Sequence, residues 1–158
     1  MPALLAPGTV IDEFTVVRPL DAQAAAAHVS DEADRCGATS VAVCLLHSWA
    51  EPAHERRLGE AIRTRRPDLH VSLSADVWPE VREHDRAMTT FLAAYLAPSM
   101  SRYLASLEGA LGDLGVRAPL WIMDSAGGLV RPAIAAARPV LTVESGGAAG
   151  VRAVAELA

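Results

Sequence analysis

The sequence contains no lysine and no asparagine, and all 14 of its basic residues are arginine. The absence of lysine excludes a Schiff-base lysine, a Ser–Lys dyad and the lysine of a P-loop. The net charge of −5 provides no basic surface for a polyanion, so nucleic acid is not an expected partner. Three tryptophans and few other aromatic residues give no stacking platform for bases either.

Cysteines and long apolar runs are equally scarce. The two cysteines, Cys36 and Cys44, are not in a Cys-x-x-Cys arrangement, and Cys44 lies in the apolar run VAVCLL, where we expect a buried thiol. There is no run of about 20 apolar residues, and the first ten residues lack the basic start of an export signal. We therefore expect a reduced, cytoplasmic setting and no membrane partner.

Helical and strand-like segments alternate along the 158 residues, a length that suits one domain. The predicted helices are residues 21–36, 51–66, a long helix from Pro79, RPAIAAA and 146–158. The predicted strands are SVAVCLLHS, LHVSLS, PLWIMDS and PVLTVES. Continuous apolar runs suit strands buried on both faces. The pattern predicts an α/β fold, a mostly parallel sheet with flanking helices. We expect residues 1–20 to be a linker or edge strand and residues 21–158 to be a single α/β domain.

The longest predicted helix begins at Pro79, because proline at the first helical position followed by Glu80 and Glu83 is typical of a helix start. Pro98 lies inside it and predicts a kink or a break into two helices. The apolar stripe expected to face inward consists of Val81, Met88, Leu92, Tyr95, Tyr103, Leu107 and Leu111.

The motif SGGAAG follows a predicted strand and precedes a predicted helix. Ser145, Gly146 and Gly147 would then be candidates for holding a pyrophosphate at the helix N-terminus. A dinucleotide site also needs an acidic residue about 20 residues later, and only eight residues follow Gly150. The alternative is that the small residues allow close helix packing.

Ser125 in MDSAGG resembles the nucleophile elbow of hydrolases, but Met123 replaces the first glycine and all five histidines precede the serine. A turn after a strand is the simpler interpretation. His47 and His54 lie near Glu51 and Glu55, but their spacing matches no metal motif, so we expect ordinary polar residues and no metal site.

The densest polar stretch is PEVREHDRAMTT, in which Glu83 and Arg86 are three residues apart. Such a pair on a helix is most simply a solvated ion pair worth a few tenths of a kcal/mol.

Several stretches in series resemble the hydantoinase A/5-oxoprolinase family, over roughly residues 38–158. They are VAVCLLHSWAEPAHERRLGEAI, VSLSADVWPEVREHDRAMTTFLAAYLAP, LWIMDSAGGLV and PVLTVESGGAAGV. Two departures stand out. Gly147 takes the place of the proline in the family's S-G-P-A-A-G, and residues 124–128 read DSAGG where the family usually has Q-S-N-G-G.

The resemblance implies part of an actin-like, ribonuclease-H-type ATPase lobe. In that superfamily two phosphate loops of the type D-x-G-G-T hold ATP and Mg²⁺, and neither string occurs here. The chain is therefore expected to be an internal segment, excised or naturally truncated, with no cofactor of its own. ATP and Mg²⁺ are expected for the full-length enzyme.

A full enzyme of this family would use ATP to open a cyclic amide or to carboxylate a ketone, by phosphorylating the amide or enolate oxygen. The segment would supply one wall of the cleft and would be inactive alone. Glu83, Arg86 and the turns at Ser125–Gly128 and Ser145–Gly147 are the site candidates, for positioning and inter-lobe packing. A hydantoinase B-like partner subunit and a homo-oligomer are expected. The alternatives are a non-catalytic docking module and a small stand-alone enzyme.

Overall fold

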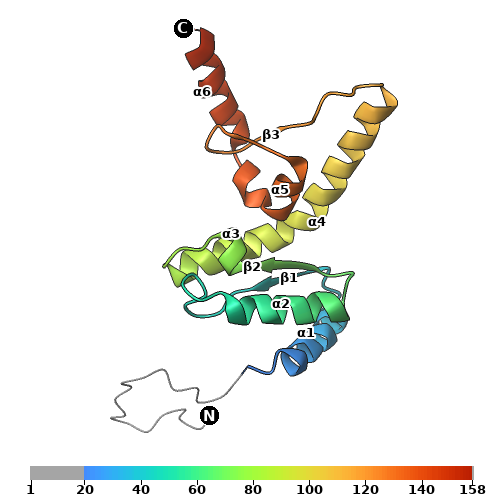
Figure 1. Ribbon diagram of the computed structural model, residues 1–158, viewed down its shortest axis with the longest axis vertical. Helices are drawn as coiled ribbons and strands as arrows, with labels where there is room; N and C mark the ends of the chain where they lie inside the picture. The colour runs from blue at the N-terminus through green and yellow to red at the C-terminus, as the bar shows by residue number, and fades with distance from the viewer. Residues whose placement is uncertain (1–19, 158) are drawn as a thin grey trace.

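The computed structural model describes residues 20–157, so the predicted linker or edge strand at 1–20 lies almost wholly outside the described residues (Figure 1). The elements, in chain order, are α1 Ala22–Cys36, β1 Ser40–Val43, α2 Ala53–Arg65, β2 His70–Leu73, α3 Ser74–Val77, α4 Glu83–Asp113, β3 Ile122–Met123, β4 Leu129–Val130, α5 Pro132–Ala137, the 3₁₀ helix η1 Pro139–Thr142 and α6 Ser145–Leu157. None of the helices within residues 20–157 is both long and apolar enough to cross a membrane.

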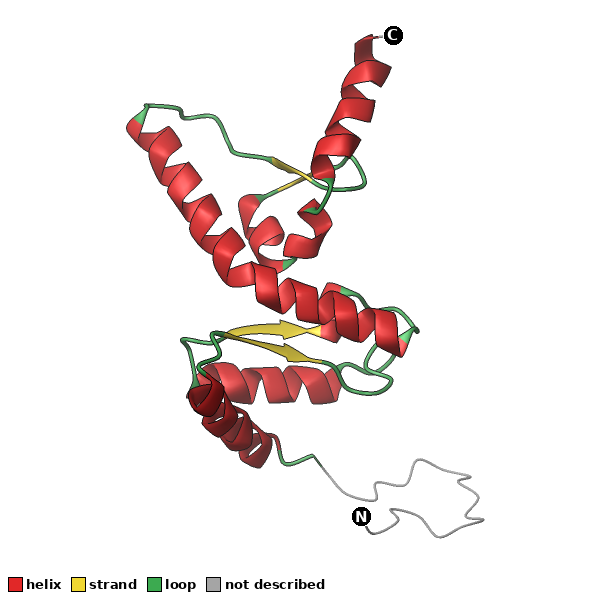
Figure 2. Ribbon diagram, turned by 180° about the vertical axis from the view of Figure 1, so that it is seen from behind, coloured by secondary structure: helices red, strands yellow, loops and turns green. Residues whose placement is uncertain are grey.

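The predicted α/β organisation is confirmed in the first half of the chain. β1, α2 and β2 form a unit in which the two strands pair in parallel, from Ser40 opposite His70 to Val43 opposite Leu73. The helices α1 and α2 lie on one side of this sheet and α4 crosses the other (Figure 2). Apolar side chains from α1, α2 and both strands form one buried core, which consists of Ala26, Ala33, Val43, Leu58, Ala61, Ile62, Leu69 and Leu73.

Helix α1 has the ends that its sequence predicts. The Asp21 carboxylate accepts the backbone N–H of Ala24 at 2.9 Å, which satisfies one of the free donors at the helix start. Gly37 ends the helix in the left-handed conformation, with φ of 66°, and glycine adopts this conformation without a steric penalty. The strand that follows is shorter than predicted. It ends at Val43, so Cys44 follows the strand and its thiol is only half-buried.

Helix α4 differs from its prediction in its start and in its buried face. It begins at Glu83 and not at Pro79, since the residues 78–82 that connect α3 to α4 are not helical. Pro98 is accommodated inside a continuous helix that bends near its middle (Figure 1). Most of the predicted inward stripe faces solvent: Val81, which precedes the helix, and Met88, Leu92, Tyr95 and Tyr103 are all exposed.

The face of α4 that packs on the sheet carries small and polar residues instead, and these are Arg86, Thr90, Ala93, Ala94 and Ala97. Alanine side chains let a helix approach a sheet closely, so the small residues mark the contact and the large apolar residues mark the opposite face.

The second half of the chain is built on a small antiparallel hairpin of β3 and β4. The predicted strand PVLTVES is wrong, since Pro139–Thr142 form η1 and pair with neither described sheet. Glu144, with φ of 64°, redirects the chain into α6, which projects from the body and has no buried residue (Figure 1).

Candidate functional site

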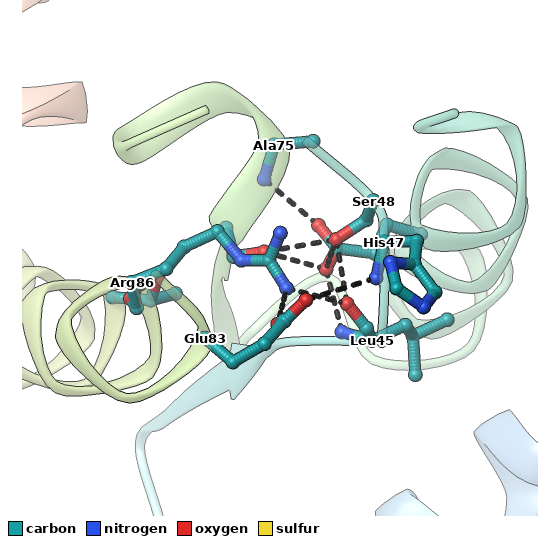
Figure 3. Close-up of polar contacts among 9 residues, drawn as sticks. Leu45, His47, Ser48, Ala75, Glu83 and Arg86 are labelled. Atoms are coloured by element: carbon teal, nitrogen blue, oxygen red, sulfur yellow. Dashed lines mark hydrogen bonds and ion pairs between the residues drawn. The ribbon is translucent and has the colours of Figure 1, made fainter. Parts of the chain in front are cut away.

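A polar cluster lies where the parallel strands β1 and β2 end. The loop after β1 contributes Leu45, His47 and Ser48, and the start of α3 after β2 contributes Ser74 and Ala75 (Figure 3). In open α/β sheets the carboxyl ends of parallel strands are where ligands bind. We therefore take this polar cluster, together with Glu55, Glu83 and Arg86, as the candidate site.

Glu55 is the centre of the polar cluster and is fully buried. Its Oε1 accepts hydrogen bonds from Leu45 N at 2.7 Å and from the hydroxyls of Ser48 and Ser74, each at 2.6 Å. Its Oε2 accepts the backbone N–H of Ala75 at 2.9 Å. One carboxylate thus ties the loop after β1 to the segment after β2.

The hydrogen bonds also set the charge state of Glu55. Burial by itself would raise the pKa of this carboxyl, because the charged form loses its hydration. The donors from Ser48, Ser74, Ala75 and Leu45 outweigh burial, and the pKa is lowered below its ordinary value. Glu55 is therefore a buried anion at neutral pH, held in place by neutral donors.

Arg86 brings a fully buried guanidinium to the same cluster from α4. Its Nη2 donates to Leu45 O at 2.8 Å and forms an ion pair with Glu83. Its Nε and Nη1 have no hydrogen-bond partner within the described part of the chain. The predicted pairing of Glu83 with Arg86 is confirmed, but the pair is not a solvated one, since only the Glu83 side chain reaches solvent, with 38% exposed.

Glu83 also holds the backbone of the loop after β1. Its Oε1 accepts the N–H of His47 at 3.2 Å, and the carbonyl of His47 accepts the N–H groups of Ala50 and Glu51. His47 has φ of 58°, a conformation that is unfavourable for a residue with a side chain. The imidazole itself is exposed, so the network fixes the backbone of His47 and leaves its ring facing solvent.

Ser125 lies in the turn after β3, where its polar groups face backbone carbonyls. Its hydroxyl lies within hydrogen-bond distance of the carbonyls of Leu141, at 2.9 Å, and Val143, and its backbone N–H also donates to Leu141 O. The neighbouring Asp124 accepts the N–H groups of Ala126 and Gly128, which closes the turn. The residue therefore fastens the hairpin to η1, which agrees with the simpler interpretation of a turn.

Ser145, Gly146 and Gly147 form the first turn of α6, in the half of the molecule away from the polar cluster (Figure 1). A Cβ atom added at Gly146 or Gly147 would meet no atom within 4 Å, so neither glycine is required for a close approach. The structure thus brings Glu83 and Arg86 together but leaves Ser125 and these three residues in other places.

Sequence reasoning missed Glu55, Ser48 and Ser74 as members of the cluster. Glutamate in the first turn of a helix is common and usually solvated, and serine after a strand is typical of any turn. The only available signal was that these residues follow two predicted parallel strands.

Residues 86–158 match the hydantoinase/oxoprolinase family, and residues 7–65 match the hydantoinase/oxoprolinase N-terminal region. The chain belongs to the hydantoinase/oxoprolinase family, as a segment of it. It is 32% identical over 146 residues to caprolactamase subunit alpha of Pseudomonas jessenii, an alignment that covers 92% of this chain and 21% of that subunit. It is 37% identical over 94 residues to 5-oxoprolinase of Saccharomyces cerevisiae, covering 60% of this chain and 7% of that protein.

Solved structures show the same relationship. The crystal structure of the ATP-dependent caprolactamase from Pseudomonas jessenii matches 78% of this chain and 18% of its own, with a TM-score of 0.69 and 31% identity. The nucleotide-free structure of acetone carboxylase matches 86% of this chain and 19% of its own, with a TM-score of 0.65 and 25% identity. The chain thus spans about a fifth of the length of these relatives, and its fold is consistent with the expected part of an actin-like lobe.

The polar cluster joins the two regions of the family hydantoinase/oxoprolinase. Glu55 lies in the N-terminal region, and Arg86 is the first residue of the second matched region. Both contact the backbone of Leu45. The Glu55 carboxylate accepts the N–H of Leu45, and the Arg86 guanidinium donates to the carbonyl of Leu45.

Both solved relatives are described as ATP-dependent, so the residues of this chain can be compared with what ATP and Mg²⁺ require. Within residues 20–157 there is no group of three or more His, Cys, Asp or Glu side chains able to hold a metal ion. The glycines at the start of α6 form no cradle, since open space surrounds them. The described residues do not fit a nucleotide–magnesium site, and we derive no step through ATP.

Proposed function

We propose that this chain supplies part of one lobe of an ATP-dependent subunit that opens a cyclic amide or, as in related enzymes, carboxylates a ketone. The match to caprolactamase over most of the chain is the observation that carries this proposal. Alone, without either phosphate loop, the chain is inactive toward ATP.

In this proposal the polar cluster forms one wall of the cleft. Glu55, Glu83 and Arg86 position the loops at the carboxyl end of the sheet and make no bonds to the reacting atoms. Their burial and mutual contacts support a positioning role, because a group that holds two loops together is not free to move during a reaction. The turns at Ser125–Gly128 and Ser145–Gly147 would pack against the other lobe.

Two measurements test the proposal. Calorimetry of the purified chain with ATP and Mg²⁺ should show no binding tighter than millimolar, and Mg²⁺-dependent micromolar binding would contradict it. Replacing the matching segment of Pseudomonas jessenii caprolactamase subunit alpha with residues 20–157 should retain ATP-dependent ring opening, whereas a folded chimera that binds ATP but opens no lactam would also count against it.

A second candidate function is docking on a partner subunit, which the exposed apolar residues favour. The outer face of α4 presents Met88, Phe91, Leu92 and Tyr95, and α6 exposes Val151, Val154 and Leu157. Large contiguous apolar surfaces mark interaction sites. The partner would be a hydantoinase B-like subunit or a second copy of this chain, and the caprolactamase relative is itself named as a subunit. A small stand-alone enzyme is the alternative that no observation favours.

A further inference from the structure

A groove of about 490 Å³ lies between the outer edge of β2 and helix α5, and no part of the polar cluster lines it. Its polar lining consists of Arg63 of α2, His70 and Ser72 of β2, Asp76 of α3, Ser101 of α4 and Arg138 after α5. Ala133, Ala136 and Ala137 supply an apolar wall on the α5 side. The volume lies within the range that small-molecule sites occupy, about 300–1,000 Å³.

The backbone of β2 offers a donor to this groove. The N–H of His70 donates to Thr39 O at 3.1 Å, so His70 pairs toward β1. Because successive residues of a strand point their N–H and C=O groups to opposite sides, those of Val71 point away from β1. The carbonyl of Val71 accepts a hydrogen bond from Arg63 Nη2 at 2.9 Å, which leaves the N–H of Val71 on the groove side.

The charges around the groove favour an anion. Arg63 and Arg138 line it, and Arg63 makes no ion pair with a described residue. The acidic residue of the lining, Asp76, faces Arg56 at 3.6 Å, so its charge is partly neutralised. Burial and then the charge of the nearby Arg63 lower the pKa of His70.

Ser72 provides a second, independent sign of a missing partner. Its side chain is buried, with 5% of the residue exposed, and its hydroxyl has no hydrogen-bond partner within residues 20–157. Buried hydroxyls normally have a partner, so the unpaired hydroxyl of Ser72 is an exception in the wall of this groove.

We propose that this groove binds a small anion, a carboxylate or a phosphate, between the guanidinium groups of Arg63 and Arg138. The N–H of Val71 adds a backbone donor at the strand edge, and the alanines of α5 accept a short apolar body. Arg63 is preorganised for this role, because its bond to Val71 O fixes the guanidinium along the strand edge. The site does not depend on the function proposed above.

NMR of the purified chain tests the proposal, with sodium butyrate, inorganic phosphate and the neutral butyramide as probes. A bound anion stabilises the imidazolium, so it should raise the pKa of His70 and shift the Val71 amide signal in a saturable way. Saturation by butyrate would identify the bound anion as a carboxylate, and saturation by phosphate would identify it as a phosphate. Butyramide, which is neutral, should neither raise the pKa of His70 nor shift the Val71 amide signal.

Variants then locate the site. Arg63→Gln and Arg138→Gln should each weaken the anion at least tenfold, whereas the control Arg57→Gln, an exposed arginine of the same helix α2 outside this groove, should not. Arg138→Gln keeps the test valid if the loss of the bond to Val71 unfolds Arg63→Gln. Equal responses to butyrate and butyramide, equal binding by all three variants, or no saturable shift would each overturn the proposal.

Discussion

The hydroxyl of Ser74 donates to the carboxylate of Glu55 at 2.6 Å across the carboxyl end of the parallel sheet. The contact joins α2 to the residues that follow β2, and the same carboxylate oxygen also holds the loop after β1. The two strands of the sheet are therefore connected at this end by a side chain as well as by their own ladder.

Glu55→Gln should destabilise the chain by about 2–4 kcal/mol, because the new amide group would present hydrogens to donors that now need an acceptor. The exposed Glu60 on the same helix provides the control, since Glu60→Gln should change stability by less than about 0.5 kcal/mol. Urea unfolding followed by circular dichroism measures both. Equal effects of the two substitutions would contradict a central role for Glu55.

The stability of the chain should fall in acid because of Glu55. Its pKa is lowered in the folded state, so its contribution is fully present above the unfolded value, 4.5, and is lost as the pH falls toward the folded pKa. Unfolding free energies measured from pH 7 to pH 3 should show this loss in the wild type. The Glu55→Gln variant should show a flatter dependence, and an unchanged slope would assign the acid sensitivity to other carboxylates.

Arg86→Met should cost less than Arg86→Ala. Methionine fills most of the space of the buried side chain and removes the two nitrogen atoms without a partner among the described residues, at a cost of about 1–3 kcal/mol, whereas alanine also leaves a cavity and should cost about 3–5 kcal/mol. Glu83 remains partly exposed, so neither variant leaves a buried carboxylate without a partner. Thermal and urea unfolding of the two variants would reveal the order, and a reversed order would mean that methionine does not fit the space of the Arg86 side chain.

Gly59 and Gly109 should respond in opposite ways to alanine. A Cβ at Gly59 would lie 2.8 Å from Leu73 Cδ2, so α2 would be pushed from β2 at a cost of about 1–3 kcal/mol. Gly109 in α4 has open space around it, and alanine there should stabilise the helix by about 0.5–1 kcal/mol. Urea midpoints compare the two variants. A neutral Gly59→Ala would show that α2 packs less closely on the strand.

The chain should self-associate at tens of micromolar through α6. Val154 is 69% exposed on a helix without a buried residue, and burial of such a face at roughly 25 cal/mol per Å² favours a symmetric pair. Light scattering should show a dimer that Val154→Asp converts to a monomer. Phe91→Asp on the outer face of α4 is the comparison, and a dimer lost only in that variant would move the interface to α4.

The sequence by itself determined the helix ends and the helical and strand segments that depend on neighbouring residues. Asp21 and Gly37 set the ends of α1 through a side-chain cap and a left-handed φ, and both depend only on neighbouring residues. Leu58, Ala61 and Ile62 recur at helical spacing and are buried as that spacing predicts. The parallel pairing of β1 and β2 followed from two apolar runs separated by a helix. The motifs in series were also sufficient to indicate the family.

Only the tertiary structure decided the features that depend on contacts between segments far apart in the sequence. The segment PVLTVES has the composition of a strand, but a strand requires a hydrogen-bonded partner strand. Among the described residues no strand pairs with it, and Pro139–Thr142 form η1. The large apolar residues of α4 recur at helical spacing, yet most of them are exposed. The sheet packs against the opposite face of the helix, where alanines permit close approach. Glu55 and Arg86 are 31 positions apart and share Leu45, a meeting that no spacing encodes because it arises only when two loops fold over the same end of the sheet.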